Sequence, residues 1–275
     1  MSESKVLKAE TESADLKRRF AGIARLYGDA GFARLQDAQL CVIGIGGVGS
    51  WAAESLARSG VGSLCLVDMD IVAESNINRQ LLATSDTLGR DKIDVMRERI
   101  EQINPSCLVT LVDDFISPDN LELVLSKQFD FVIDCIDDFR TKAALISYCR
   151  RNKTNLLTVG GAGGQIDPAK IVQADLSRTE HDVLLARTRK LLRQDYGFPK
   201  NLKRSFSIPC VYSKEQLVYP DGDGGISPQR PASEDTTQSN ALNCAGGIGS
   251  ITHITASFGL VASAYVLNKI AANEH

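Results

Sequence analysis

Paired cysteines are missing from this sequence. Its seven cysteines are scattered over 275 residues, and none forms a C-x-x-C motif. This spacing argues against a cysteine zinc site and a disulfide framework, so it favours a reducing environment. His181 and His253 also lack a spacing typical of metal ligands. We therefore expect no zinc and a cytoplasmic location.

A strong net charge and an apolar N-terminal run are missing as well. The chain carries 31 Lys and Arg against 34 Asp and Glu, a formal net charge of −3. This balance gives no global sign of a nucleic-acid partner but leaves room for a local basic patch. The first twenty residues have no apolar run, so the sequence predicts no secretory signal and a flexible segment over residues 1–17.

Charged side chains are absent between Thr236 and Asn268. Residues 248–267 are apolar enough to suggest a membrane span by hydropathy alone. Serine, threonine and histidine side chains interrupt this segment, however, and a helix buried against a sheet explains it better. We expect that helix over residues 248–270 and no membrane partner.

Apolar strand-like runs alternate with helical patterns along most of the chain. The predicted strands cover residues 39–44, 63–68, 107–113, 130–135, 155–159 and 169–174, and the predicted helices cover 18–31, 48–59, 91–103, 118–127, 140–152 and 181–196. This alternation predicts an α/β fold with a Rossmann-like, mostly parallel sheet and helices on both faces. A nucleotide-binding domain is expected over 18–175. A C-terminal sub-lobe over 176–275, with antiparallel strands and a mobile loop at 220–240, completes the same globular unit.

A glycine-rich turn follows the first predicted strand. It contains Gly44, Gly46, Gly47 and Gly49, and a second apolar strand ends at Asp68. Glycines let backbone N–H groups approach phosphate, and the following helix N-terminus favours an anion. Asp68 is placed to hold ribose hydroxyls. This layout is typical of dinucleotide binding and alone suggests a nicotinamide-dependent dehydrogenase.

Polar residues further along the chain favour ATP instead. Arg79 and Lys92 can neutralise triphosphate charge, and Asp137 can hold Mg²⁺ at the tip of a strand facing the same crevice. Hydride transfer to nicotinamide does not call for these groups. The expected nucleotide-binding residues are Gly44, Gly46, Gly47, Gly49, Asp68, Asp70, Asn76, Arg79, Gln80, Lys92 and Asp137. Asp134 leaves two interpretations open, a cap of the following turn or a functional group.

The ordered set of these motifs resembles the adenylation domain of the ubiquitin-activating-enzyme superfamily, over about residues 18–175. The set comprises Gly44–Gly49, Asp68-x-Asp70, Asn76-x-x-Arg79-Gln80, Lys92, Asn104-Pro105 and Asp134-x-x-Asp137. The resemblance implies ATP and Mg²⁺, with a monovalent cation as a further candidate, and catalytic roles for Arg79, Lys92 and Asp137. It also implies a homodimer in which Arg19 or Arg25 acts across the interface. Many relatives have arginine where this chain has Lys142.

A closer resemblance covers almost the whole chain. The motifs Arg25–Gly28, Gly44–Glu54, Val112–Phe115, Tyr148–Lys153, Gly160–Pro168 and Asn243–Gly247 are similar to those of the tRNA threonylcarbamoyladenosine dehydratases. That family implies a tRNA substrate whose threonylcarbamoyl carboxylate, next to the anticodon, is adenylated and then cyclised with loss of water. It also implies contacts with cysteine desulfurase sulfur-relay proteins, for which Cys244 is the candidate sulfur acceptor.

Three other functions stay open at this stage. The chain could adenylate the C-terminus of a ubiquitin-like or sulfur-carrier protein, although the missing C-x-x-C pairs count against it. A nicotinamide-dependent oxidoreductase is disfavoured by Arg79 and Lys92. A non-enzymatic sulfur relay centred on Cys244 is the third alternative, beside the interpretation of that cysteine as an incidental thiol.

Overall fold

The computed structural model describes residues 3–126, 128–229 and 248–273. A seven-stranded sheet runs through its centre in the order β3-β2-β1-β4-β5-β7-β6. All neighbouring strands are parallel except β6 and β7, which are antiparallel. The strands are β1 (Gln39–Ile43), β2 (Ser63–Val67), β3 (Leu108–Val112), β4 (Phe131–Asp134), β5 (Leu156–Val159), β6 (Ile171–Asp175) and β7 (Pro209–Ser213). The prediction of a mostly parallel Rossmann-like sheet is confirmed.

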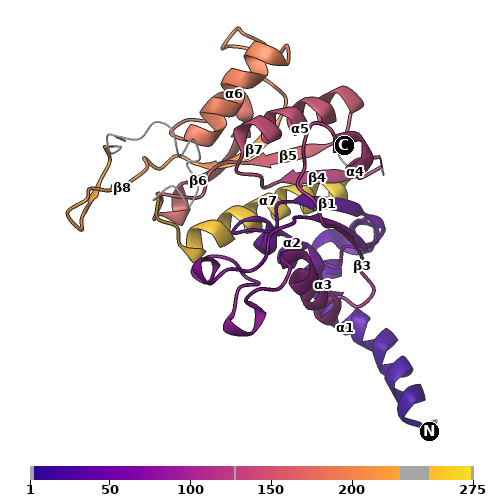
Figure 1. Cartoon of the computed structure of the whole chain (residues 1–275). Coiled ribbons are helices and arrows are strands. Elements are labelled where there is room, and N and C mark those ends of the chain that lie inside the picture. Colours follow the sequence, from indigo (N-terminus) through magenta and orange to yellow (C-terminus); the bar gives the residue numbers. More distant parts are fainter. Residues whose placement is uncertain (1–2, 127, 230–247, 274–275) are drawn as a thin grey trace.

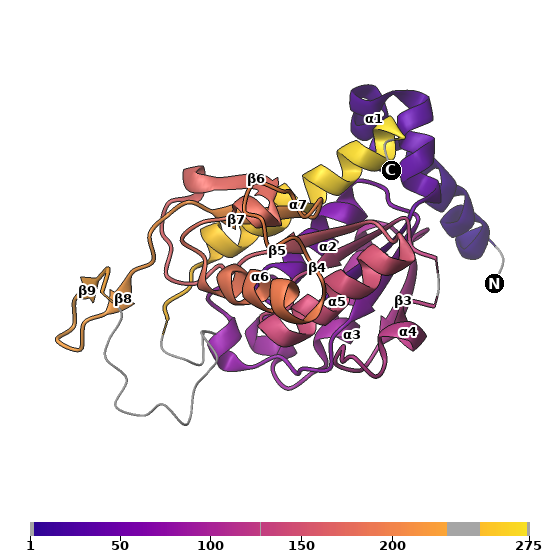
Figure 2. The same cartoon turned by 90° about the horizontal axis from the view of Figure 1, so that it is seen from above.

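Helices cover both faces of this sheet (Figures 1 and 2). One face carries α1 (Glu3–Asp37), α2 (Gly49–Arg58), α3 (Lys92–Ile103) and α7 (Thr252–Ala272), and the other carries α4 (Leu121–Val124), α5 (Phe139–Asn152) and α6 (Val183–Asp195). Alternate residues of one strand serve the two faces: Leu40 and Val42 pack in the first core, and Cys41 and Ile43 in the second. This alternation follows from the two-residue period of a strand and explains why both faces are apolar.

The remaining elements are short. They are the 3-10 turns η1 (Glu74–Asn76), η2 (Ser85–Thr87), η3 (Pro168–Lys170) and η4 (Leu176–Arg178), and a small antiparallel ribbon of β8 (Tyr219–Pro220) and β9 (Ile226–Ser227). The ribbon begins one residue before the loop predicted at 220–240 and continues into its first part. Residues 230–240 of that loop are outside the described residues.

The N-terminal region differs from the sequence prediction. In place of a flexible segment over 1–17 and a short helix over 18–31, one helix, α1, extends from Glu3 to Asp37 with a kink at Gly28 (φ 72°, ψ 163°). The segment between Glu3 and Lys17 contains no glycine or proline and is rich in strong helix formers, which accounts for the longer helix. Figure 1 shows its first turns projecting away from the sheet.

The C-terminal helix α7 is long and apolar enough to cross a membrane by length and composition alone. Within its most apolar window, 56% of the residues are buried inside the protein. It packs along α2 and α1 and also contacts β5 and β7. Phe258, Ala262 and Val266 lie in the first core with no exposed surface. The predicted helix buried against a sheet is therefore present, and its bounds are Thr252–Ala272.

Candidate nucleotide site

The strand order places the predicted polar residues along one edge of the sheet. In parallel α/β sheets, ligands bind outside the carboxyl ends of the strands, where the strand order reverses. Here the reversal lies between β1 and β4. Gly44 follows β1, Asp68 follows β2, and Asp134 ends β4. The residues collected from three separate parts of the sequence therefore lie along the carboxyl edge of the sheet, where such folds bind ligands.

The glycine loop is built so that only glycine fits at two positions. Gly44 has a φ of 86°, which side chains rarely tolerate. A Cβ atom on Gly49 would lie 1.8 Å from the Gly44 carbonyl oxygen. The loop then enters α2, where the Ser50 amide and hydroxyl both donate to the Gly46 carbonyl, at 3.1 and 2.7 Å.

Backbone amides of this loop are available to an anion. Among the residues that the structure describes, the N–H groups of Gly46 and Gly47 have no hydrogen-bond partner. They lie at the N-terminal end of α2, where the helix dipole favours negative charge. The loop can therefore accept phosphate oxygens without breaking an existing bond.

Asp68 supports the glycine loop from the neighbouring strand. Its carboxylate accepts hydrogen bonds from the Ile45 amide at 2.6 Å and the Asp70 amide at 2.8 Å. The side chain is buried, and burial raises its pKa above the usual value, partly offset by the nearby Lys92 charge. The structure thus gives Asp68 a role in holding the loop; the predicted ribose contact stays a prediction.

Lys92 and Asp70 form an ion pair beside the loop. The Lys92 ammonium lies 2.7 Å from the Asp70 carboxylate, and the lysine side chain is 6% exposed against 53% for the aspartate. Lys92 begins α3, so its position is fixed by the helix start. The sequence predicted both as nucleotide ligands; their contact with each other was not predicted.

The segment from Asn76 to Gln80 is anchored by its backbone. The Arg79 carbonyl accepts from the Trp51 indole at 3.2 Å and from the Thr255 hydroxyl at 3.0 Å. The Arg79 guanidinium donates to the Ser75 carbonyl at 2.6 Å. Helices α2 and α7 thus hold the main chain of this segment, although these two partners carry no motif signal in the sequence.

Asn76 and Gln80 are both buried within the same segment. The Asn76 amide oxygen accepts from the Ala73 backbone at 3.1 Å. The Gln80 side-chain oxygen has no hydrogen-bond partner among the described residues. Its amide nitrogen lies 3.7 Å from where a Cβ on Gly46 would be. A buried unpaired acceptor beside the glycine loop is a feature that a bound ligand or water would satisfy.

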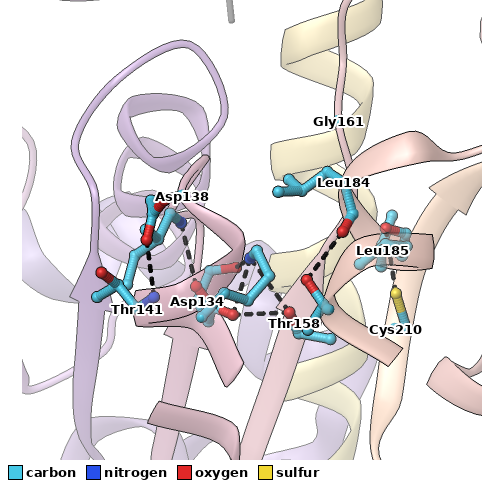
Figure 3. Close-up of polar contacts among 12 residues, drawn as sticks. Asp134, Asp138, Thr141, Thr158, Gly161, Leu184, Leu185 and Cys210 are labelled. Carbon is cyan, nitrogen blue, oxygen red and sulfur yellow. Dashed lines mark hydrogen bonds and ion pairs between the residues drawn. The ribbon is translucent and has the colours of Figure 1, made fainter. Parts of the chain in front are cut away.

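The turn between β4 and α5 presents Asp137. This residue is exposed, and within the described chain no hydrogen bond or ion pair engages its carboxylate. The next residue, Asp138, caps α5 by accepting from the Arg140 and Thr141 amides at 3.1 and 2.8 Å (Figure 3). Lys142 is fully buried and bonds to Asp134 rather than facing the crevice.

The donor set fits Mg²⁺ only in combination with phosphate. Among the described residues, no group of three or more Asp, Glu, His or Cys side chains could hold a metal ion. Mg²⁺ commonly uses one or two carboxylates together with substrate phosphates and water. The single exposed carboxylate of Asp137 fits a Mg²⁺ ion that is also bound by phosphate and water. The described residues do not form a site in which protein side chains alone would surround the ion.

Three predicted residues lie away from this crevice or outside the described chain. Arg19 donates to the carbonyls of Gln102 and Ile103, at the C-terminal end of α3. Arg19 also lines a cavity of about 440 Å³, at the opposite end of α2 from the glycine loop. The other residues that line this cavity are Phe20, Arg58, Arg99, Gln102 and Ile103. Arg25 is exposed on α1. Cys244 lies outside the described residues.

Comparison with known proteins shows the family of this chain. The profile of the ThiF family matches residues 17–272. The chain is 52% identical to the tRNA threonylcarbamoyladenosine dehydratase of Haemophilus influenzae over 254 residues, which cover 92% of this chain and 94% of that protein. The crystal structure of the E. coli tRNA N6-threonylcarbamoyladenosine dehydratase in complex with ATP superposes with a TM-score of 0.82 and 48% identity, covering 94% of this chain and 95% of the other.

A sulfur-carrier-activating relative is similar over a shorter region. The sulfur carrier protein ThiS adenylyltransferase of Escherichia coli is 36% identical over 135 residues, which cover 48% of this chain and 53% of that protein. The family profile, by contrast, spans nearly the whole chain. This protein belongs to the ThiF family, and it shares almost its full length with members of that family named tRNA threonylcarbamoyladenosine dehydratase.

Proposed function

We propose that this chain catalyses the ATP-dependent dehydration of threonylcarbamoyladenosine in tRNA, next to the anticodon, through adenylation of the substrate carboxylate. The observation that carries the proposal is the near end-to-end match to a dehydratase at 52% identity. The match to a sulfur-carrier adenylyltransferase stops at about half of either chain. The dehydratase match therefore extends over much of the chain that the sulfur-carrier match leaves uncovered.

The proposed chemistry needs no protein nucleophile. The threonyl carboxylate attacks the α-phosphate of ATP, which forms an acyl-adenylate and releases pyrophosphate. A nucleophilic atom of the carbamoyl group on the same side chain then attacks the acyl carbon and displaces AMP. AMP retains one oxygen of the original carboxylate, so the nucleoside loses one water overall. Because the second step is intramolecular, proximity supplies much of its rate.

Residues around the crevice divide this work. The free amides of Gly46 and Gly47 would bind phosphate oxygens. Arg79 and Lys92 would neutralise charge on the triphosphate, with Lys92 already held in place by Asp70. Asp137 would hold Mg²⁺, which supplies Lewis-acid neutralisation of phosphate charge when it is bound. Asp68 keeps the loop in the geometry that these contacts require.

The remaining partners are supported by family resemblance. We propose a cytoplasmic homodimer that uses tRNA as substrate. In that dimer Arg19 or Arg25 would act on the partner's site, which requires Arg19 to leave its carbonyl contacts at α3. A role of Cys244 as sulfur acceptor for relay proteins is a separate proposal, because the cyclisation itself uses no thiol.

The test is a reaction with defined substrates. The protein is incubated with ATP, Mg²⁺ and tRNA that carries threonylcarbamoyladenosine, and the nucleosides are analysed by mass spectrometry. Loss of one water from that nucleoside, with AMP and pyrophosphate formed in equal amounts, is expected. Arg79→Ala should abolish turnover, whereas Arg97→Ala, an arginine held by surface ion pairs on α3, should not. An unchanged nucleoside, with pyrophosphate released only when a carrier ending in two glycines is added, would support the alternative.

A further inference from the structure

A fully buried ion pair lies directly behind the turn that carries Asp137. Asp134 is the last residue of β4, Lys142 lies in the first turn of α5, and Thr158 pairs with Asp134 across β5. All three residues are 0% exposed. Figure 3 shows Asp134 and Thr158 pointing toward one another beside the start of α5. The three elements that frame the turn thus meet at one polar cluster inside an apolar core.

Every polar atom of this cluster has a partner. The Lys142 ammonium donates to the Asp134 carboxylate at 2.8 Å, to the Thr158 hydroxyl at 3.2 Å and to the Asp134 carbonyl at 3.5 Å. The Thr158 hydroxyl donates to the same carboxylate oxygen at 2.7 Å. The other carboxylate oxygen of Asp134 accepts from the Ile136 amide at 3.1 Å. The cluster uses all three lysine donors and leaves no unpaired charge.

These bonds fix both ends of the turn. At its start, the Asp134 carboxylate holds the Ile136 amide, one residue before Asp137. At its end, Asp138 caps α5, whose first turn is held by Lys142. Asp137 is therefore the exposed residue between two anchored neighbours, and its own carboxylate is left to face solvent.

A buried ion pair is weak support for stability alone, because desolvation offsets much of the attraction between the charges. Positioning a residue for catalysis is a second reason for a fold to contain one, since functional side chains must be held by locked neighbours. The pair brackets the turn, with Asp134 three residues before Asp137 and Lys142 five residues after it, and this location favours the second reason.

We propose that Asp134, Lys142 and Thr158 are positioning residues whose buried hydrogen bonds orient Asp137 toward a magnesium-bound nucleotide. The inference rests on the proposed function only for the presence of a nucleotide in this crevice. In this proposal Lys142 does not contact the ligand, unlike an arginine that would reach the nucleotide from this position, because the Lys142 ammonium is enclosed by Asp134 and Thr158.

The test measures how ATP binding depends on Mg²⁺, without tRNA. Calorimetric titrations of ATP over a series of Mg²⁺ concentrations give a midpoint for each variant. Thr158→Val removes the hydroxyl and keeps the side-chain shape, and Thr158→Ser restores the hydroxyl. Thr188→Val is the matched control, since Thr188 is equally buried but bonds only the Leu184 carbonyl within α6.

Thr158→Val should raise the Mg²⁺ midpoint by about three- to tenfold, the range expected for one buried hydrogen bond. Thr158→Ser should stay close to the parent, and Thr188→Val should leave the midpoint unchanged. Asp137→Asn should raise it at least as far, and adding Thr158→Val to Asp137→Asn should cause no further rise. This lack of additivity is expected because the cluster acts through Asp137.

Two results would overturn the proposal. One is a Thr158→Val protein with a lower melting temperature but an unchanged Mg²⁺ midpoint, which is the behaviour of a purely structural cluster. The other is an Asp137→Asn/Thr158→Val protein whose fold-change in the Mg²⁺ midpoint equals the product of the fold-changes of the two single variants. Failure of the proposed tRNA reaction is distinguishable from both, because the coupling between Thr158 and Asp137 is measured on ATP and Mg²⁺ alone.

Discussion

Replacing Lys142 by methionine tests how much the buried cluster depends on its cation. Methionine has a similar length but no charge, so the Asp134 carboxylate would remain 0% exposed without its ammonium partner. Removing one partner of a buried ion pair typically costs about 3–5 kcal/mol of unfolding free energy. That loss is a large share of the roughly 5–15 kcal/mol that stabilises a folded domain.

The double variant Asp134→Asn/Lys142→Met removes both charges together. It should recover part of the loss, since no uncompensated charge stays in the core. The matched control is Lys170→Met, whose ion pair with Asp167 is 3.9 Å long with both side chains about half exposed. A pair of that kind contributes less than about 1 kcal/mol.

Urea unfolding at neutral pH, followed by circular dichroism, measures these differences as shifts of the midpoint at constant slope. The reasoning would be refuted by a Lys142→Met protein within about 1 kcal/mol of the parent, since breaking a buried pair should cost more. It would also be refuted by a double variant that loses the sum of both single changes, because residues in one network should couple.

Three further outcomes are expected. Burial raises the pKa of Asp175, but hydrogen bonds from hydroxyls and backbone amides outweigh it and lower that pKa below the usual value. The stability that Asp175 contributes should therefore be present above about pH 4 and fade at lower pH. The difference in unfolding free energy between the parent and Asp175→Asn, measured over this pH range, checks the expectation. Gly49→Ala should weaken ATP binding at least tenfold in calorimetric titration, because its Cβ would lie 1.8 Å from the Gly44 carbonyl oxygen and force the loop open (roughly 1–3 kcal/mol of strain). Asp137→Ala should lower turnover of the modified tRNA by about 100-fold or more, whereas Cys244→Ala should leave turnover nearly intact. A folded but inactive Cys244→Ala protein would assign the thiol a role in the reaction.

The main features of the fold could be predicted from local patterns. Apolar runs bounded by glycine and acid gave strands whose centres agree with the structure, as at Leu64–Val67 and Val132–Asp134. The expectation of antiparallel strands towards the C-terminus is confirmed, but the pairing of β6 with β7 could not be predicted in this way, because it joins residues about 40 positions apart. The sequence also did not predict the length of α1, since residues 3–17 are mostly charged or polar and their few apolar residues form no continuous stripe of the kind that marks a packed helix.

Some parts of the candidate site could likewise be predicted from a local sequence motif, and others could not. The glycine loop and Asp68 belong to a recognised spacing, and the structure places them at the strand-order reversal. What each side chain touches depends on sheet register instead. Asp68 reaches Ile45 because β1 and β2 are neighbours, and Asp134 reaches Thr158 because the two residues pair across β4 and β5.

Register and helix phase also explain the place of Lys142, where many relatives have arginine. Its position five residues after Asp137 suggests a place in the crevice, as in a family motif. The helix begins at Phe139, however, and Lys142 comes at the end of the first turn, on the side that faces β4 and β5. A buried lysine needs a paired carboxylate, and only the fold shows that Asp134 supplies it. The sequence motif therefore identifies the residues that can bind a nucleotide, whereas the contacts that would hold them in place come from strand pairing and helix phase.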